Sequence, residues 1–265
     1  MRVQTATRPG TPGVPNEDWV STTSHRSGTG GALVVLDGVT PPPGDDGCVH
    51  GVPWYTARLG AALLELSASR RDMTLTQCLA EAVARTAAAH RSTCDLSHVR
   101  TPQATVVAAR WDEEAVEHLV LSDSVLLLVS PSGAVTPVLD DRLDALRPAV
   151  RELPRAERVA RIEALRNAEG GFHTAAADPA VAELAVTGTT PRAAVRSLAA
   201  LTDGASRWTE VFGLGDWAGL YAVLRAEGPE ALIGRVRDAE AADPSGTAYP
   251  RGKTSDDATA ALVEF

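Results

Sequence analysis

The side chains best suited to chemistry in this chain are acids that end or interrupt apolar runs. Ala32–Leu36 is apolar throughout, which predicts a buried strand, and Asp37-Gly38 ends that run. A carboxylate is tolerated there only if it projects into a cleft, and the glycine lets the chain turn or approach a ligand closely. The pattern recurs where Leu198–Leu201 leads into Thr202-Asp203-Gly204. We therefore expect a scaffold that brings these aspartates to one site.

Other acidic residues share this position at, or within, strand-like apolar runs: Glu17-Asp18, Asp123 and Asp256-Asp257. A ligand set made of carboxylate oxygens, with no histidine or thiolate, suits Mg²⁺ or Mn²⁺ and argues against zinc or copper. Two such ions can share a bridging water, deprotonate it and neutralise a phosphoryl group under attack. Each motif also has a purely structural interpretation, because Asp-Gly is a common turn dipeptide and paired acids can protect an edge strand.

Composition limits the classes of function that remain. The 265 residues carry a net charge of −9 and no cluster of Lys and Arg, so nucleic-acid binding is not expected. The three cysteines, Cys48, Cys78 and Cys94, form no C-x-x-C pair, so neither a disulfide framework nor a zinc knuckle is indicated, and a cytoplasmic location fits. The start lacks the apolar core of a signal peptide, and the most apolar run, 119–129, is too short and too polar to span a bilayer.

The elements that must position the acids follow from apolar spacing and turn residues. Residues 1–15, rich in Pro, Gly and Thr, predict an irregular lead-in, and the whole of 1–265 is expected to form a single domain. Thr74 is a plausible N-cap for the helix expected at about 76–90. Strands at 105–110, 115–121, 124–130 and 134–138 predict an antiparallel meander. Helices are expected at about 54–69, 76–90, 155–167, 214–226 and 229–242, and a final strand beyond 256.

The order of the short acidic motifs is more specific than any one of them. Asn16-Glu17-Asp18, Leu36-Asp37-Gly38, Leu121-Ser122-Asp123-Ser124, Leu201-Thr202-Asp203-Gly204 and Asp256-Asp257-Ala258-Thr259 follow one another along essentially the whole chain. This series resembles the N-E-D, D-G, G-D-S, S-D-G and D-N-x-T motifs of the PPM (PP2C-type) metal-dependent Ser/Thr protein phosphatases, and the chain looks like a divergent bacterial member. The resemblance implies an α+β fold, a four-layer α-β-β-α sandwich in which two antiparallel sheets are flanked by helix pairs.

The resemblance also implies roles for individual residues. Asp37 would bridge two Mn²⁺ or Mg²⁺ ions, the Gly38 carbonyl would bind one of them, and Asp203 and Asp256 would hold the other. Asp37, Asp203 and Asp256 are thus the expected catalytic residues, with a metal-bridging hydroxide attacking phosphorus in line. The remaining expected ligands are Glu17 and Asp18, through waters, and Asp123, which with Asp203 would hold a third ion.

The sequence departs from the family pattern at several positions. The family usually has an arginine before N-E-D that grips the substrate phosphate, whereas Gly13 stands here. Arg8, Arg251 and Lys253 are substitutes, each with the alternative of being an ordinary surface charge. His50, on the loop after Gly38, is a candidate general acid, although an isolated histidine is more often structural.

Three functions remain open from the sequence. The first is a phosphomonoester hydrolase, specifically a phosphoserine/phosphothreonine protein phosphatase whose partner is a phosphorylated protein. The second, favoured by the missing arginine, is a catalytically weak or inactive PP2C-like binding or regulatory domain. The third is an unrelated Mg²⁺-dependent hydrolase of a small phosphorylated metabolite. The sequence leaves oligomeric state, physiological substrate and the choice of Mn²⁺ or Mg²⁺ undetermined.

Overall fold

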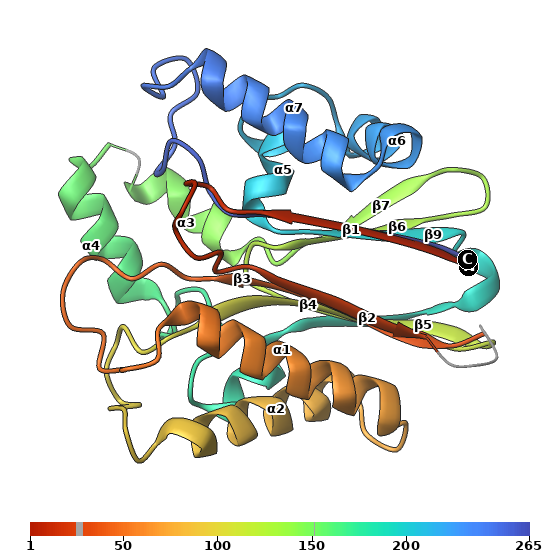
Figure 1. Cartoon of the computed structure of the whole chain (residues 1–265), viewed down its shortest axis with the longest axis horizontal. Coiled ribbons are helices and arrows are strands. Elements are labelled where there is room, and N and C mark those ends of the chain that lie inside the picture. Colours follow the sequence, from red (N-terminus) through yellow and green to blue (C-terminus); the bar gives the residue numbers. More distant parts are fainter. Residues whose placement is uncertain (25–28, 151) are drawn as a thin grey trace.

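Two antiparallel sheets face each other at the centre of the molecule in the computed structural model, which describes residues 1–24, 29–150 and 152–265 (Figure 1). Within those residues each sheet has five strands. The first sheet has the order β1 (Arg2–Arg8), β10 (Ala258–Glu264), β9 (Ser197–Leu201), β6 (Val125–Val129) and β7 (Val135–Val138). The second has the order β2 (Trp19–Ser24), β3 (Gly31–Gly38), β4 (Ala104–Trp111), β5 (Ala115–Leu121) and β8 (Val186–Pro191).

Helices cover the outer face of each sheet. The face of the second sheet is covered by α1 (Val52–Ser69) and α2 (Leu75–His90), and that of the first by α5 (Asp203–Glu210), α6 (Trp217–Glu227) and α7 (Pro229–Ala242) (Figure 1). At one end of the sandwich lie α3 (Arg142–Val150) and α4 (Arg155–Leu165). Short 3₁₀ turns occur at Pro179–Leu184 and Arg192–Ala194. The expected four-layer α-β-β-α fold is confirmed.

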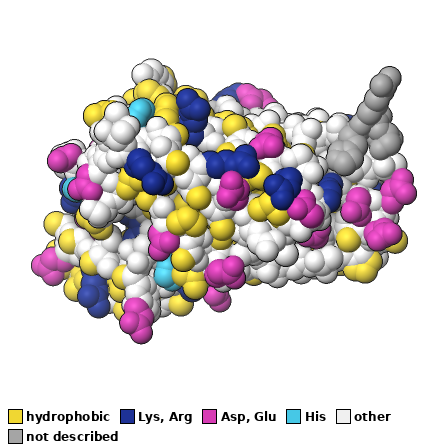
Figure 2. All heavy atoms as spheres, turned by 90° about the horizontal axis from the view of Figure 1, so that it is seen from below, with side chains coloured by type: hydrophobic (Ala, Val, Ile, Leu, Met, Phe, Trp, Pro, Cys, Tyr) yellow, Lys and Arg dark blue, Asp and Glu magenta, His cyan; other side chains and the backbone are white. Residues whose placement is uncertain are grey.

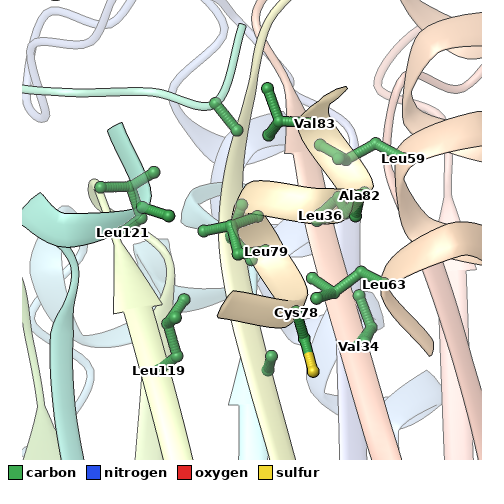
Figure 3. Close-up of a cluster of buried hydrophobic side chains, with 14 of the residues drawn as sticks. Val34, Leu36, Leu59, Leu63, Cys78, Leu79, Ala82, Val83, Leu119 and Leu121 are labelled. Atoms are coloured by element: carbon green, nitrogen blue, oxygen red, sulfur yellow. The ribbon is translucent and has the colours of Figure 1, made fainter. Parts of the chain in front are cut away.

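The apolar run Ala32–Leu36 is buried on both faces of β3. Leu33 and Val35 contribute to the core between the sheets, whereas Val34 and Leu36 pack against α1 and α2 (Figure 3). A strand covered on both faces needs apolar residues at successive positions, which explains why this run does not alternate with polar residues. The strand therefore holds Asp37 rigidly at its end.

Most of the expected helices and strands are present in the structure, but the N-terminal lead-in and the meander differ from expectation. Thr74 caps α2 through a capping box with Gln77. The lead-in expected to be irregular contains β1, because Arg2–Arg8 gains hydrogen-bonding partners from β10 at the far end of the chain. The expected meander is divided, since β4 and β5 pair in one sheet while β6 and β7 pair in the other. The chain crosses between the sheets at Ser122, whose φ of 70° makes the turn.

The outer surface over α1 and α2 carries basic and acidic side chains interspersed with one another (Figure 2). No helix among the described residues is both long enough and apolar enough to cross a membrane.

Candidate metal centre

Strand pairing brings the predicted acids to the same end of the sandwich. Leu201 pairs with Ala260 on one side and with Val125 on the other, so the residues just beyond these strand ends lie together. Those residues include Asp203, the first residue of α5, together with Asp123 before β6 and Asp256 before β10. In the facing sheet, Asp37 is the penultimate residue of β3 and Asp18 immediately precedes β2.

Direct hydrogen bonds join the two sheets at this end. The backbone N–H of Asp203 donates to Asp37 Oδ2 over 3.4 Å, and the Thr202 hydroxyl donates to Asp18 Oδ2 over 2.8 Å. Asp257 accepts from the backbone N–H groups of Gly10 at 2.7 Å and Glu17 at 2.6 Å. The acids therefore occupy a junction between the two sheets, and Asp257 fixes the segment that carries Glu17 and Asp18.

Burial and mutual repulsion make this group of carboxylates unfavourable without a cation. Burial raises the pKa of Asp37 well above its ordinary value of 3.8, and the charges of Asp203, Asp18, Asp256 and Asp123 raise it further. The pKa of Asp18 is also raised well above that value, first by burial and then by Asp203 and Asp257 against hydrogen bonds from two threonines.

The same effect extends to the other expected ligands. Burial is the largest cause of the raised pKa of Asp203, Asp256, Asp123 and Glu17, and neighbouring carboxylates add to it. Asp18 is only 8% exposed, and its Oδ1 has no hydrogen-bond partner among the described residues. An unpartnered buried carboxylate oxygen is energetically costly. The side chains at this site therefore supply only part of the positive charge that the carboxylates need.

Two basic side chains supply part of that charge at Asp256. Arg207 donates to Asp256 Oδ2 at 3.0 Å, and the Lys253 ammonium donates to Asp256 Oδ1 at 2.6 Å. Lys253 also donates to the Thr40 hydroxyl at 2.9 Å, and Thr40 in turn donates to Glu17. Arg207 was not among the residues expected at the site, although its position four residues after Asp203 in α5 predicts a place on the same helix face.

The three candidate phosphate ligands lie in different surroundings. Arg8 pairs with Glu230 on α7, and Arg251 pairs with Asp243 at 2.9 Å. Lys253 alone of the three is bonded to one of the expected metal ligands. A further arginine, Arg147 of α3, lies 3.7 Å from Asp123 and is more than half exposed.

The His50 side chain contacts two cysteines and a tryptophan instead of the carboxylates. Its Nδ1 is 3.3 Å from the Cys94 sulfur and 3.7 Å from the Cys48 sulfur, and its ring stacks on Trp54. The role of His50 as a general acid therefore stays a prediction, which these contacts do not support. Among the described residues, these cysteines and histidines form a group whose ligand atoms lie close enough together to hold one metal ion, and no three carboxylates form such a group.

Comparison with known proteins gives a result at the level of structure only. No protein-family profile matches the sequence, and no curated protein matches it. Among solved structures, the serine/threonine phosphatase Stp1 from Staphylococcus aureus superposes with a TM-score of 0.63 at 14% identity, covering 99% of this chain and 94% of that one. The chain has a PP2C-type phosphatase fold.

Other structures with this fold superpose equally completely. Mycobacterium tuberculosis PstP/Ppp gives a TM-score of 0.61 at 14% identity, over 100% of this chain and 98% of that one. The catalytic domain of PstP, solved with two manganese ions, gives 0.59 at 15% identity, over 99% of this chain and 97% of that one. The superpositions establish the PP2C-type fold. Because the sequence identities are so low, activity must be argued from the site itself.

Proposed function

We propose that the chain is a metal-dependent phosphomonoester hydrolase that acts on phosphoserine or phosphothreonine in proteins. The observation that carries the proposal is the convergence of Asp18, Asp37 and Asp203 at one junction of a PP2C-type fold, where burial and repulsion raise the pKa of each. The proposal takes 1–265 as one domain and places it in the cytoplasm.

The chemical type of the donor atoms at this junction suits a pair of hard divalent cations. The donors are carboxylate and carbonyl oxygens, which Mn²⁺ and Mg²⁺ prefer, and the unpartnered Asp18 Oδ1 is the kind of group that a cation or its water satisfies. Asp37 and the Gly38 carbonyl would hold the first ion, and Asp37, Asp203 and Asp256 the second. Bound there, the ions would supply a nucleophile at neutral pH and positive charge against the phosphoryl oxygens.

The outer positions of the site follow from the same placement. Glu17 and Asp18 would act through water molecules, since Asp18 already accepts from Thr202 and Glu17 from Thr40. Asp123, whose charge raises the pKa of Asp203 in the structure, would complete a weaker third metal site with Asp203.

Lys253 is our candidate for binding the substrate phosphate. Its side chain is 46% exposed and flexible, so its ammonium can exchange Asp256 for a phosphate oxygen. When a cation takes over the charge of Asp256, that exchange costs little. Arg147, exposed beside Asp123, is the second basic group that can contact a phosphoprotein at this end of the molecule.

One observation favours a second candidate, a catalytically weak binding or regulatory domain. Both carboxylate oxygens of Asp256 are bonded to basic side chains, Arg207 and Lys253, so the protein itself neutralises one of the expected ligands. No arginine stands at the position before Asn16-Glu17-Asp18 where the family pattern has one. A domain of this kind would bind phosphoproteins and release them unchanged.

We expect hydrolysis of p-nitrophenyl phosphate with Mn²⁺ or Mg²⁺, and a loss of at least roughly a hundredfold after chelation, because the ions supply both nucleophile and charge. Adding Mn²⁺ back should restore the activity, and Asp203→Ala should abolish it. Equal turnover in the presence of chelator would contradict the proposal, whereas Mn²⁺ binding without turnover would support the second candidate. Comparing a phosphopeptide with a sugar phosphate then tests the substrate class.

A further inference from the structure

Four potential metal ligands meet at a second place, outside the carboxylate junction. Cys48 and His50 lie on the loop between β3 and α1, His90 is the last residue of α2, and Cys94 lies in the turn that follows. Their ligand atoms all lie within 4.8 Å of one another. His50 Nδ1 is 3.3 Å from Cys94 Sγ and 3.7 Å from Cys48 Sγ, and His90 Nδ1 is 3.5 Å from Cys48 Sγ.

The backbone holds the two halves of this cluster in place. The N–H of Cys94 donates to the carbonyl of His90 at 3.0 Å, so the i, i+4 spacing puts both side chains on one face of a helical turn. The N–H of Asp95 donates to the carbonyl of Gly47 at 2.7 Å, which joins the residue after one cysteine to the residue before the other. A side chain at Gly47 would meet His98 at 2.6 Å, so the loop can approach this closely only with glycine.

We propose that Cys48, His50, His90 and Cys94 bind one Zn²⁺ in a closed, tetrahedral structural site. Zinc–sulfur and zinc–nitrogen bonds of about 2.3 and 2.05 Å at tetrahedral angles put sulfur and nitrogen about 3.6 Å apart. The observed separations of 3.3, 3.5 and 3.7 Å lie on either side of that value.

The two sulfur atoms are the part of the cluster that must adjust. They lie 2.7 Å apart, whereas shared zinc ligation requires about 3.8 Å. Both cysteines are free, and their sulfur atoms are farther apart than the about 2.05 Å of a disulfide bond. Cys48 and Cys94 lie on partly exposed segments, so a rotation of the side chains can open the space between them.

The donor set selects zinc over the ions proposed at the carboxylates. Two thiolates and two imidazoles are a typical structural zinc set, and four protein ligands leave no open position for catalysis. The imidazole of His90 is 1% exposed, and its Nε2 has no hydrogen-bond partner among the described residues, so the polar contact of this ring is with Cys48. Trp54 stacks on His50 with ring centroids 4.1 Å apart and shields one side.

The consequence for the fold is an anchored loop. The loop from Val39 to Gly51 begins directly after Asp37-Gly38 and carries Thr40, which contacts Glu17 and Lys253. It contains few hydrophobic residues that could fix it by packing, whereas a zinc ion would tie it to the end of α2. The zinc site would thus hold one wall of the carboxylate junction without taking part in catalysis, and it does not depend on the proposed phosphatase activity.

The test is the metal content of the 265-residue protein purified under reducing conditions. We expect about one zinc per chain that survives dialysis. The C48S/C94S double variant should lose that zinc. The control is Cys78→Ala, because Cys78 lies on the buried face of α2, 12 residues before His90, and its loss should leave the zinc in place (Figure 3).

Replacement of zinc by Co²⁺ in the wild-type protein identifies the ligands without relying on variants that fail to fold. We expect the intense visible bands of a tetrahedral ion and a near-ultraviolet sulfur-to-cobalt charge-transfer band, both absent from C48S/C94S. Zinc-free protein whose mass shows two fewer hydrogens, as in a Cys48–Cys94 disulfide, would overturn the proposal. A cobalt spectrum without the sulfur band, or tightly bound zinc retained by the double variant, would overturn it equally.

Discussion

Replacing Asp37 with asparagine is expected to reduce metal-dependent phosphatase activity on the order of a thousandfold or more, because the change removes the charge that the proposal places between both cations. Asparagine has nearly the same shape. Asp37 Oδ2 accepts a long hydrogen bond from the Asp203 N–H, and the amide oxygen can still accept it. Removal of a charge repelled by Asp203 and Asp18 should leave the melting temperature of the metal-free protein unchanged or higher.

The matched control is Asp216→Asn, the same chemical change at an exposed position. Asp216 caps α6 by accepting from the Gly219 N–H, and asparagine caps as well as aspartate. We expect full activity and normal stability from this variant. If the Asp37→Asn variant keeps wild-type kcat and KM, Asp37 is not a metal ligand of the active site. If the variant fails to unfold cooperatively, Asp37 has a structural role instead.

Replacing Arg207 with alanine is expected to destabilise the fold by about 3 kcal/mol or more, because it breaks a buried ionic network. The Arg207 side chain is 6% exposed and donates to Glu240 Oε1 at 2.7 Å and to Asp256 Oδ2 at 3.0 Å. Without it, Glu240, whose side chain is 2% exposed, keeps Arg237 as its one ion-pair partner among the described residues. Urea unfolding followed by circular dichroism measures the free energy.

The exposed pair of Arg8 with Glu230 provides the comparison. Their side chains are 45% and 60% exposed, and an exposed pair of this kind contributes no more than about 1 kcal/mol. Arg8→Ala should therefore lower the free energy of unfolding far less than Arg207→Ala. Equal effects of the two substitutions would contradict the assignment of Arg207 as the buried cation that holds α5, α7 and the segment before β10 together.

Most of the fold could be predicted because its elements follow from local patterns. The apolar run of β3 and the N-cap of α2 at Thr74 are determined by neighbouring residues, and both are observed. Strand β1 could not be predicted in this way, since its polar sequence forms a strand only through pairing with β10 at the opposite end of the chain. The separation of β5 from β6 depends on which helices cover each sheet, which no local pattern specifies.

The site divides in a similar way between local and long-range information. The acids were recognisable because each lies at, or within, a strand-like apolar run, and the structure places Asp18, Asp37 and Asp203 in one hydrogen-bonded junction. Lys253 was expected only as a candidate phosphate ligand, and its bond to Thr40, like that from Arg207 to Glu240, could not be predicted because each joins segments far apart in sequence.

The cysteine cluster shows the limit of motif spacing. The absence of a C-x-x-C pair indicated no zinc site, yet C-x-H at Cys48 and H-x-x-x-C at His90 converge once α2 packs beside the loop. The spacing of His90 and Cys94 on one helical turn was the available signal. The pairing of the two half-sites depends on the fold, which brings the end of the loop between β3 and α1 to the end of α2.

The central claim, that the carboxylates at the sheet junction hold divalent cations, is tested most directly by calorimetric titration of the protein with Mn²⁺. Because Asp18, Asp37 and Asp203 have raised pKa values, they retain protons above the ordinary carboxylate range, and Mn²⁺ must displace those protons. The account predicts binding of two ions at about pH 7.5, at least roughly tenfold weaker binding at about pH 5.5, and loss of the tighter site in Asp37→Asn. No Mn²⁺ binding, or binding that neither acid pH nor Asp37→Asn weakens, would contradict it.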